Sequence, residues 1–106
     1  MFAKDFSLTK LFDRYAPLLT EKQQTAFSLY YNEDFSLAEI AEHTLTSRQA
    51  VRSLLQKTTS ELLRFEEALH LVSKEEALSS LVRALEAAPE EEVFQIAEKI
   101  LALTKE

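Results

Sequence analysis

The sequence of 106 residues contains no cysteine and no glycine, and only two prolines. The absence of cysteine excludes disulfide bonds, thiol catalysis and zinc sites built from cysteine. The absence of glycine excludes the P-loop and the dinucleotide-binding fingerprint, because both need glycine for a tight turn close to phosphate. The common routes to nucleotide chemistry are therefore excluded. Because a chain without cysteine has no disulfide bonds, the cytoplasm is the expected compartment.

Long hydrophobic runs are also missing. No stretch approaches the ~18 apolar residues of a membrane-spanning helix, and Lys4 and Asp5 are not followed by the apolar run of a signal peptide. Without glycine, β-hairpins would lack the residue that supplies positive φ in their favoured turns. We therefore predict an all-α fold, forming a single cytoplasmic domain over residues 1–106, without membrane contact.

Capping boxes mark the predicted helix starts. In such a box a Ser or Thr hydroxyl accepts from the backbone N–H three residues on, where Glu or Gln reaches back. The four candidate pairs are Thr20 with Gln23, Ser36 with Glu39, Thr46 with Gln49, and Ser73 with Glu76. Together with apolar residues at helical spacing, they predict helices at 7–16, 21–32, 37–43, 47–72, 74–87 and 90–104.

Charge is unevenly distributed along the chain, which carries 12 basic and 18 acidic side chains and a net charge of −6. Residues 1–35 hold four basic and five acidic groups, residues 36–64 four and three, and residues 65–106 four and ten. The middle of the chain is thus slightly basic and its C-terminal part strongly acidic. Such asymmetry often separates an anion-binding part from the rest.

Residues 36–55, SLAEIAEHTLTSRQAVRSLL, form two predicted helices joined by a break of about three residues. The small residue Ala41 would let the two helices approach closely at their crossing, as a helix-turn-helix requires. The predicted inner stripes consist of Leu37, Ile40 and Ala41 on the first helix, and Ala50, Val51, Leu54 and Leu55 on the second.

At about 100° per residue, Arg48, Gln49 and Arg52 point away from the inner stripe of the second helix. Arg and Gln suit paired contacts with guanine and adenine, and the start of a helix favours phosphate. We therefore predict nucleic-acid binding, to DNA first and RNA second, by Thr46, Ser47, Arg48, Gln49, Arg52, Ser53, Gln56 and Lys57. The alternative is an ordinary solvent-exposed face. The net charge of −6 favours this alternative, because affinity for nucleic acid comes largely from basic side chains that neutralise phosphates.

The segment from Leu19 to Arg64 resembles region 4 of the bacterial sigma-70 family, through LLTEKQ at 18–23, LYYNEDFSLAEIAE at 29–42 and SRQAV at 47–51. The whole chain is similar to the YlxM family of small sigma-like proteins. The resemblance implies a helix-turn-helix portion at 19–64, followed by a long helix and an acidic helical portion at 65–106. It also implies a regulator linked by gene neighbourhood to the signal recognition particle, with Ser47 to Val51 opening the recognition helix.

The sequence departs from the family at the turn, where a glycine followed by an apolar residue is usual. Here Leu45 and Thr46 occupy these positions. A left-handed leucine would cost on the order of 1 kcal/mol. We therefore expect a reshaped turn, which would alter how Arg48 and Gln49 are presented.

An apolar seam runs at steps of four and three from residue 51 to residue 72, the spacing of a coiled coil or a bundle core. We predict that it packs against the C-terminal helices of the same chain or forms a homodimer. Its residues are Val51, Leu55, Leu62, Phe65, Leu69 and Val72.

Enzymatic activity is not expected. Only His43 and His70 could act as near-neutral bases, and neither has a recognisable nucleophile or ligand pattern around it. We predict no catalytic residue, metal, cofactor or small-molecule substrate. The alternative to nucleic-acid binding is a protein-interaction module whose acidic tail docks a component of the signal recognition particle.

Overall fold

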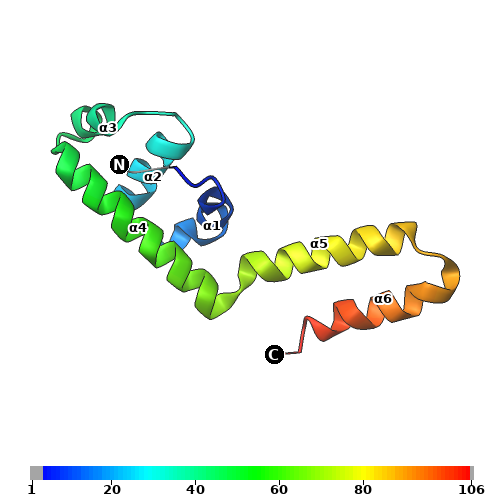
Figure 1. Cartoon of the computed structure of the whole chain (residues 1–106). Coiled ribbons are helices and arrows are strands. Elements are labelled where there is room, and N and C mark those ends of the chain that lie inside the picture. The colour runs from blue at the N-terminus through cyan, green and yellow to red at the C-terminus, as the bar shows by residue number, and fades with distance from the viewer. Residues whose placement is uncertain (1–3, 106) are drawn as a thin grey trace. The chain divides into compact units, whose positions relative to one another are not determined.

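The computed structural model describes residues 4–105, which form six α-helices, one 3-10 helix and no strand. This confirms the all-α prediction. The chain divides into two compact units, residues 1–69 and 70–106. The boundary between them lies a few residues beyond residue 64, the predicted end of the helix-turn-helix portion. The elements are α1 (Leu8–Tyr15), η1 (Ala16–Leu18), α2 (Glu21–Tyr31), α3 (Leu37–Thr44), α4 (Arg48–Leu69), α5 (Leu71–Ala87) and α6 (Glu90–Ala102) (Figure 1).

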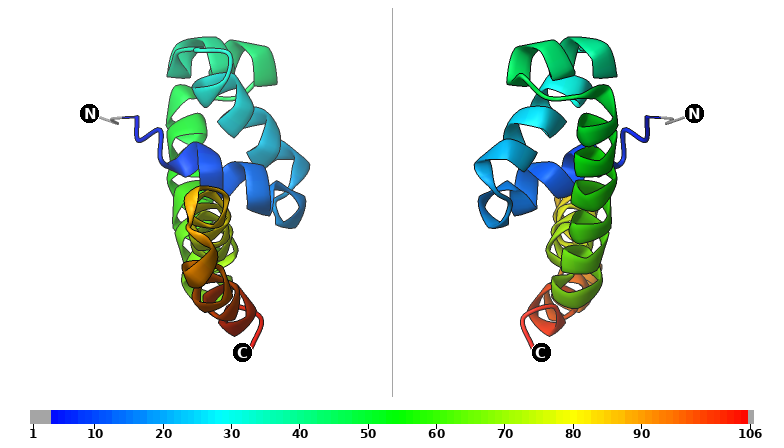
Figure 2. Two further views of the ribbon diagram at one scale, coloured as in Figure 1. Left: turned by 90° about the vertical axis from the view of Figure 1, so that its right-hand side faces the viewer. Right: turned by 90° about the vertical axis from the view of Figure 1, so that its left-hand side faces the viewer.

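The first unit is built on α4, which packs against α1, α2 and α3. Helix α3 lies across the N-terminal end of α4 (Figure 2). The buried stripe of α4 consists of Val51, Leu55, Thr58 and Leu62. The first half of the predicted seam is therefore covered within this unit, whereas Phe65 and Val72 are half-buried and Leu69 is exposed.

Aromatic side chains fill the space between α1 and α2. Phe27 is 1% exposed and stacks between Phe12 and Tyr31, with ring centroids 4.4 Å away on each side. The hydroxyl of the buried Tyr15 donates to the Glu66 carboxylate at 2.6 Å, which ties α1 to the far end of α4. These contacts fix the scaffold on which α3 and the start of α4 are mounted.

Two of the four predicted capping boxes are confirmed. At Thr20 and at Ser36 the hydroxyl accepts from the N–H three residues on, and the Gln23 or Glu39 side chain accepts from the backbone N–H of the capping residue. The box at Thr46 is wrong by one residue: α4 begins at Arg48, and the Ser47 hydroxyl accepts from the Ala50 N–H at 3.0 Å.

The predicted helix boundary at residues 72–74 is also wrong. Helix α4 ends at Leu69, and His70 takes the left-handed conformation with φ 55° before α5 begins at Leu71. The Ser73 hydroxyl lies inside α5 and donates to the His70 carbonyl instead of capping a helix. The apolar pattern accounts for the break, because the stripe that passes through 62, 65 and 69 does not continue in phase with Leu78 and Leu85.

The turn between α3 and α4 is not reshaped, contrary to expectation. Leu45 adopts the left-handed conformation with φ 57° and ψ 42°. Its N–H donates to the Glu42 carbonyl at 3.4 Å, and the Thr46 N–H donates to the Ala41 carbonyl at 3.0 Å, which is a Schellman motif. These bonds hold the turn despite the strain, and the 92% exposed Leu45 side chain meets no packed neighbour.

We expect Leu45→Gly to stabilise the first unit by about 0.5–1 kcal/mol. The left-handed conformation costs a non-glycine residue about 1–2 kcal/mol, of which glycine's greater freedom in the unfolded chain returns part. Urea unfolding followed by tyrosine emission would measure the change, because all three tyrosines lie in this unit and there is no tryptophan. Leu45→Ala retains the Cβ and should change stability by less; equal effects of both substitutions would contradict strain at this position.

Candidate nucleic-acid interface

A pocket of about 480 Å³ lies where the start of α3 faces the start of α4. It brings together three of the residues predicted to contact nucleic acid, Arg48, Gln49 and Arg52. The other wall is formed by Ser36, Leu37 and Ala38, which were not among the residues predicted to contact nucleic acid. One turn of each helix thus contributes to a single concave surface.

The first turn of helix α3, with its cap Ser36, lines this pocket. The Ser36 hydroxyl accepts from the Glu39 N–H at 3.1 Å, and a Glu39 carboxylate oxygen accepts from the Ser36 N–H at 2.9 Å. This capping leaves the N–H groups of Leu37 and Ala38 without an acceptor within α3, as is usual in the first turn of a helix. Such N–H groups, together with the positive end of the helix dipole, favour an oxyanion.

Helix α4 supplies the positive charge. Arg48 and Gln49 are exposed and Arg52 is half-buried. Within residues 4–105 no ion pair with a carboxylate is found for either guanidinium. Both arginines are therefore available to an external anion, and their planar guanidinium groups can bind phosphate or a guanine edge through two hydrogen bonds.

A second hollow, of about 370 Å³, adjoins the first and shares Arg52, Ser36 and Leu37 with it. The Lys4 ammonium lies there, 2.7 Å from the Asp34 carboxylate and 4.6 Å from the centre of the Tyr30 ring. The hydrogen bond from Lys4 and its charge hold the pKa of Asp34 below its ordinary value. Lys4 is thereby paired at the surface with a carboxylate of the same chain, so this hollow adds little positive charge to the interface.

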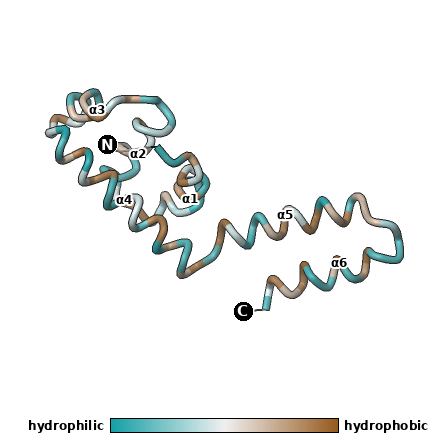
Figure 3. The backbone as a smooth tube through the Cα atoms, viewed as in Figure 1, coloured by the Kyte–Doolittle hydropathy of each residue, from teal (hydrophilic) through white to brown (hydrophobic). Residues whose placement is uncertain are grey.

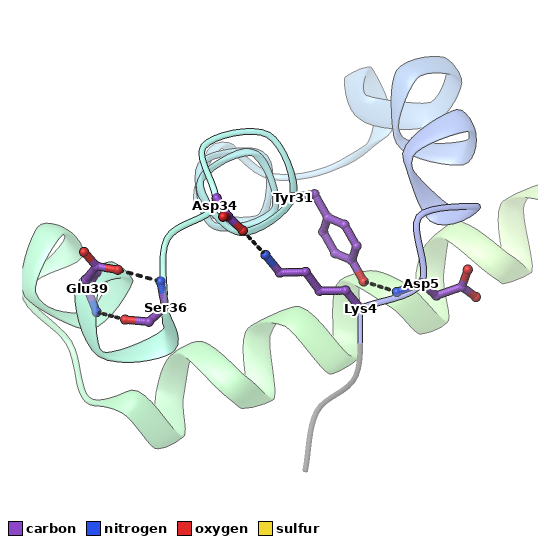
Figure 4. A network of polar contacts seen from close by, with 6 residues as sticks. All are labelled: Lys4, Asp5, Tyr31, Asp34, Ser36 and Glu39. Carbon is purple, nitrogen blue, oxygen red and sulfur yellow. Dashed lines mark hydrogen bonds and ion pairs between the residues drawn. The ribbon is translucent and has the colours of Figure 1, made fainter.

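The same region anchors the start of the described chain to α2. The Asp5 N–H donates to the Tyr31 hydroxyl at 3.3 Å, beside the Lys4–Asp34 pair (Figure 4). The Asp5 carboxylate accepts from the hydroxyl and the N–H of Ser7, which lowers the pKa of Asp5. Lys4 thus lies at one border of the candidate interface, held in place by the anchored residues that follow it.

The remaining predicted residues are distributed differently. Ser53, Gln56 and Lys57 are exposed along α4, whereas the Ser47 hydroxyl is engaged as the helix cap. Thr46, Ala50 and Leu54 line a separate groove of about 630 Å³. Arg48, Gln49 and Arg52 instead line the 480 Å³ pocket between α3 and α4, which we call the anion pocket. Ala50 is exposed, so its prediction as an inner-stripe residue was wrong, whereas Leu54 is half-buried.

The missed residues carried a signal in the sequence. The capping box at Ser36 located the start of α3, but the crossing of α3 over α4 is a tertiary feature that spacing alone does not give.

Within the described residues, no three His, Asp or Glu side chains come together as a metal site would require. No helix in the same range combines the length and the hydrophobicity needed to cross a membrane.

A short helix, a three-residue Schellman turn and a second helix with an exposed polar edge define the class: this is a helix-turn-helix protein. The chain belongs to the UPF0122 family, whose model, described as "Putative helix-turn-helix protein, YlxM / p13 like", matches residues 2–102. The resemblance to the YlxM family is thereby confirmed.

Three relatives illustrate the similarity. A UPF0122 protein of Halalkalibacterium halodurans is 42% identical over 103 residues, which cover 97% of this chain and 93% of the relative. A UPF0122 protein of Mycoplasma capricolum is 43% identical over 86 residues, 81% of this chain and 76% of the relative. One from Clostridium kluyveri is 51% identical over 67 residues, 63% of this chain and 60% of the relative.

Proposed function

We propose that this chain is a regulatory nucleic-acid-binding protein that uses the α3–α4 edge to contact duplex DNA. The observation that carries the proposal is the convergence of Arg48, Gln49 and Arg52 with the first turn of α3 on one pocket. A backbone phosphate would bind between the Leu37 and Ala38 N–H groups and Arg52. Arg48 and Gln49, at the exposed start of α4, would then reach base edges in the major groove.

The charge distribution sets the expected strength of binding. Residues 36–64 carry a net charge of +1 in a chain of −6, so few phosphates can be neutralised. Each neutralised phosphate contributes about −0.9 to the slope of log affinity against log salt concentration. With two or three phosphates bound, we expect a slope of about −2 to −3, and modest affinity for a single copy.

Fluorescence anisotropy with labelled duplex DNA across a salt series tests this proposal. The Arg48→Ala, Arg52→Ala double variant should bind at least about tenfold more weakly, because it removes the side-chain cations of the pocket. Lys22→Ala with Arg64→Ala removes the same charge elsewhere in the first unit and should have a smaller effect. Absence of binding below about 100 µM at low salt, or equal losses in both double variants, would refute the proposal.

The cellular setting follows from the family resemblance and is also a proposal. We propose that the protein acts in the cytoplasm, in the signal recognition particle pathway, with the RNA of that particle as the second candidate ligand. The same anisotropy assay with that RNA separates the two ligands. Affinity for the duplex with none for the RNA would remove the RNA arm and leave the DNA arm.

A second candidate function is a protein-interaction module, and the acidic C-terminal part favours it. Glu90, Glu91 and Glu92 are exposed in the first turn of α6, where the helix dipole stabilises them. Here the acidic part would dock a basic component of the signal recognition particle. Reversing these three charges should then weaken binding to that component, whereas the arginine variant should not.

Homodimerisation is a further proposal, because pairing would double the few contacts that one helix-turn-helix makes. Val51, Leu55 and Leu62 are already buried within the first unit, and Val72 lies beyond the break at His70, so a dimer along the α4 seam would have to use Phe65 and Leu69. Sedimentation velocity over a range of concentrations tests this, and a concentration-independent monomer would remove it.

A further inference from the structure

The second unit is a helical hairpin of α5 and α6 that buries none of its described residues. Two helices alone rarely enclose a hydrophobic core, and a unit of this size normally needs further packing to be stable. The hairpin nevertheless carries many hydrophobic residues, which alternate with hydrophilic ones along both helices (Figure 3). The arrangement of these residues shows where a partner would lie.

Each helix carries two adjacent apolar stripes. On α5 the half-buried residues Ala77, Leu81 and Leu85 form the stripe that faces α6, and on α6 Ile96, Ile100 and Leu103 form the stripe that faces α5. About 80–110° further round, at about 100° per residue, each helix carries a second, exposed stripe. These exposed stripes consist of Leu71, Leu78 and Val82 on α5, and Val93, Phe94, Ala97 and Leu101 on α6.

The two exposed stripes lie on the same side of the hairpin. On both helices the exposed stripe is rotated about the helix axis away from the inner stripe. The direction of rotation is the same for both when each helix is viewed from its N-terminus to its C-terminus. Because the two helices of a hairpin run in opposite directions, equal rotations turn both exposed stripes toward one face. The hairpin therefore has a single continuous apolar face, which we call the hairpin face.

The hairpin face is large enough to be an interaction surface. Phe94 is 72% exposed, Leu101 57% and Leu78 41%, and with their neighbours they expose on the order of 500 Å² of apolar surface. A patch of this size is at the upper end of those found on monomeric proteins, where such patches often have a binding function.

The charged residues around the hairpin face are mostly acidic. Glu86 borders it on α5, Glu98 borders it on α6, and Glu90 lies at its end in the first turn of α6, whereas the half-buried Lys74 lies within the inner stripe of α5. Arg83 lies farther round α5 and contacts the Ser80 hydroxyl. The unit as a whole holds four basic and eight acidic side chains, a net charge of −4. An apolar face with an acidic border is complementary to an apolar stripe with a basic border.

We propose that the hairpin face binds a basic amphipathic helix of another protein. Such a helix would complete a three-helix bundle, placing its apolar stripe against Leu78, Val82 and Phe94 and its lysines or arginines beside the bordering carboxylates. A second copy of this chain is a poorer occupant, since pairing two hairpin faces would bring two sets of carboxylates together. The inference does not depend on nucleic-acid binding by the first unit.

Labelled peptides and the full-length chain provide the test. The probe is an 18-residue amphipathic helix with leucine on one face and lysine on the other, and its counterpart carries glutamate in place of lysine. In fluorescence anisotropy the lysine peptide should bind at least about tenfold more tightly than the glutamate peptide, and added salt should reduce this difference. The Arg48→Ala, Arg52→Ala double variant should bind the lysine peptide as well as the unaltered chain does.

Matched variants locate the binding surface. Leu78→Ser with Phe94→Ser keeps the net charge and should weaken lysine-peptide binding at least about tenfold. Leu18→Ser replaces a leucine that is 56% exposed in the first unit and should leave binding unchanged. Glu86→Gln with Glu98→Gln keeps the apolar face and should weaken binding through charge alone. Circular dichroism would verify that every variant keeps its helix content.

Three results would overturn the inference. One is no binding of the lysine peptide at about 100 µM, well above the range of specific helix-in-groove complexes. Another is equal affinity for both peptides. The third is a dimer in sedimentation velocity that Leu78→Ser with Phe94→Ser dissociates, which would assign the hairpin face to a second copy.

Discussion

Replacing Phe27 by alanine should lower the free energy of unfolding of the first unit by about 3–5 kcal/mol. The ring is 1% exposed and stacks on both faces, against Phe12 and Tyr31, so truncation removes buried area and leaves a cavity between two aromatic rings. Because a small domain is stabilised by only about 5–15 kcal/mol, the variant would be close to its unfolding threshold.

Urea unfolding followed by tyrosine emission measures this effect in the first unit alone, since Tyr15, Tyr30 and Tyr31 all lie there. Phe27→Leu retains most of the volume and should cost less than Phe27→Ala. Leu18→Ala truncates an exposed side chain and should change stability by less than about 1 kcal/mol. A loss below about 1 kcal/mol for Phe27→Ala would show that the aromatic stack is not a supporting element.

Ile40→Ala should cost about 2–5 kcal/mol and should also impair nucleic-acid binding. Ile40 is fully buried, and with Ala41 it provides the buried surface of α3. Loosening α3 would displace the Leu37 and Ala38 N–H groups from Arg48 and Arg52, although no residue of the anion pocket is altered.

Two measurements separate the parts of this prediction. Ile40→Val keeps most of the contact and should cost about 0.5–1.5 kcal/mol with near-normal DNA affinity. Duplex binding by Ile40→Ala should be measured at a temperature where tyrosine emission shows the first unit still folded. Unchanged affinity under that condition would mean that α3 does not contribute to the interface.

Most of the secondary structure could be predicted from the sequence, because local chemistry determines it. Thr20 and Ser36 have the hydroxyl and the partner three residues on that a capping box needs, and both helices begin there. The burial of Val51, Leu55 and Leu62 likewise follows from their helical spacing. The two wrong boxes arose where two hydroxyls competed, at Thr46 and Ser47, and where the apolar stripe changed phase, near His70.

The candidate site could be predicted only in part. The exposed positions of Arg48 and Gln49 follow from the periodicity of one helix, but their juxtaposition with Leu37 and Ala38 depends on how α3 crosses α4. The geometry of Leu45 was mispredicted because propensity argues against a left-handed leucine, whereas the two Schellman hydrogen bonds outweigh that preference. Local backbone hydrogen bonds at Leu45, and tertiary packing at the α3–α4 crossing, thus decided what residue propensity could not.

The lack of a buried residue in the α5–α6 hairpin has a consequence for its internal motions. Amide protons exchange with solvent when a helix opens locally. The free energy of such opening is smallest where few side chains must leave a packed interior. The hairpin amides should therefore exchange well before those at Leu55 or Leu62. A ligand that covered the hairpin would slow this exchange. The cost of ordering these two helices would reduce the net binding free energy of that ligand.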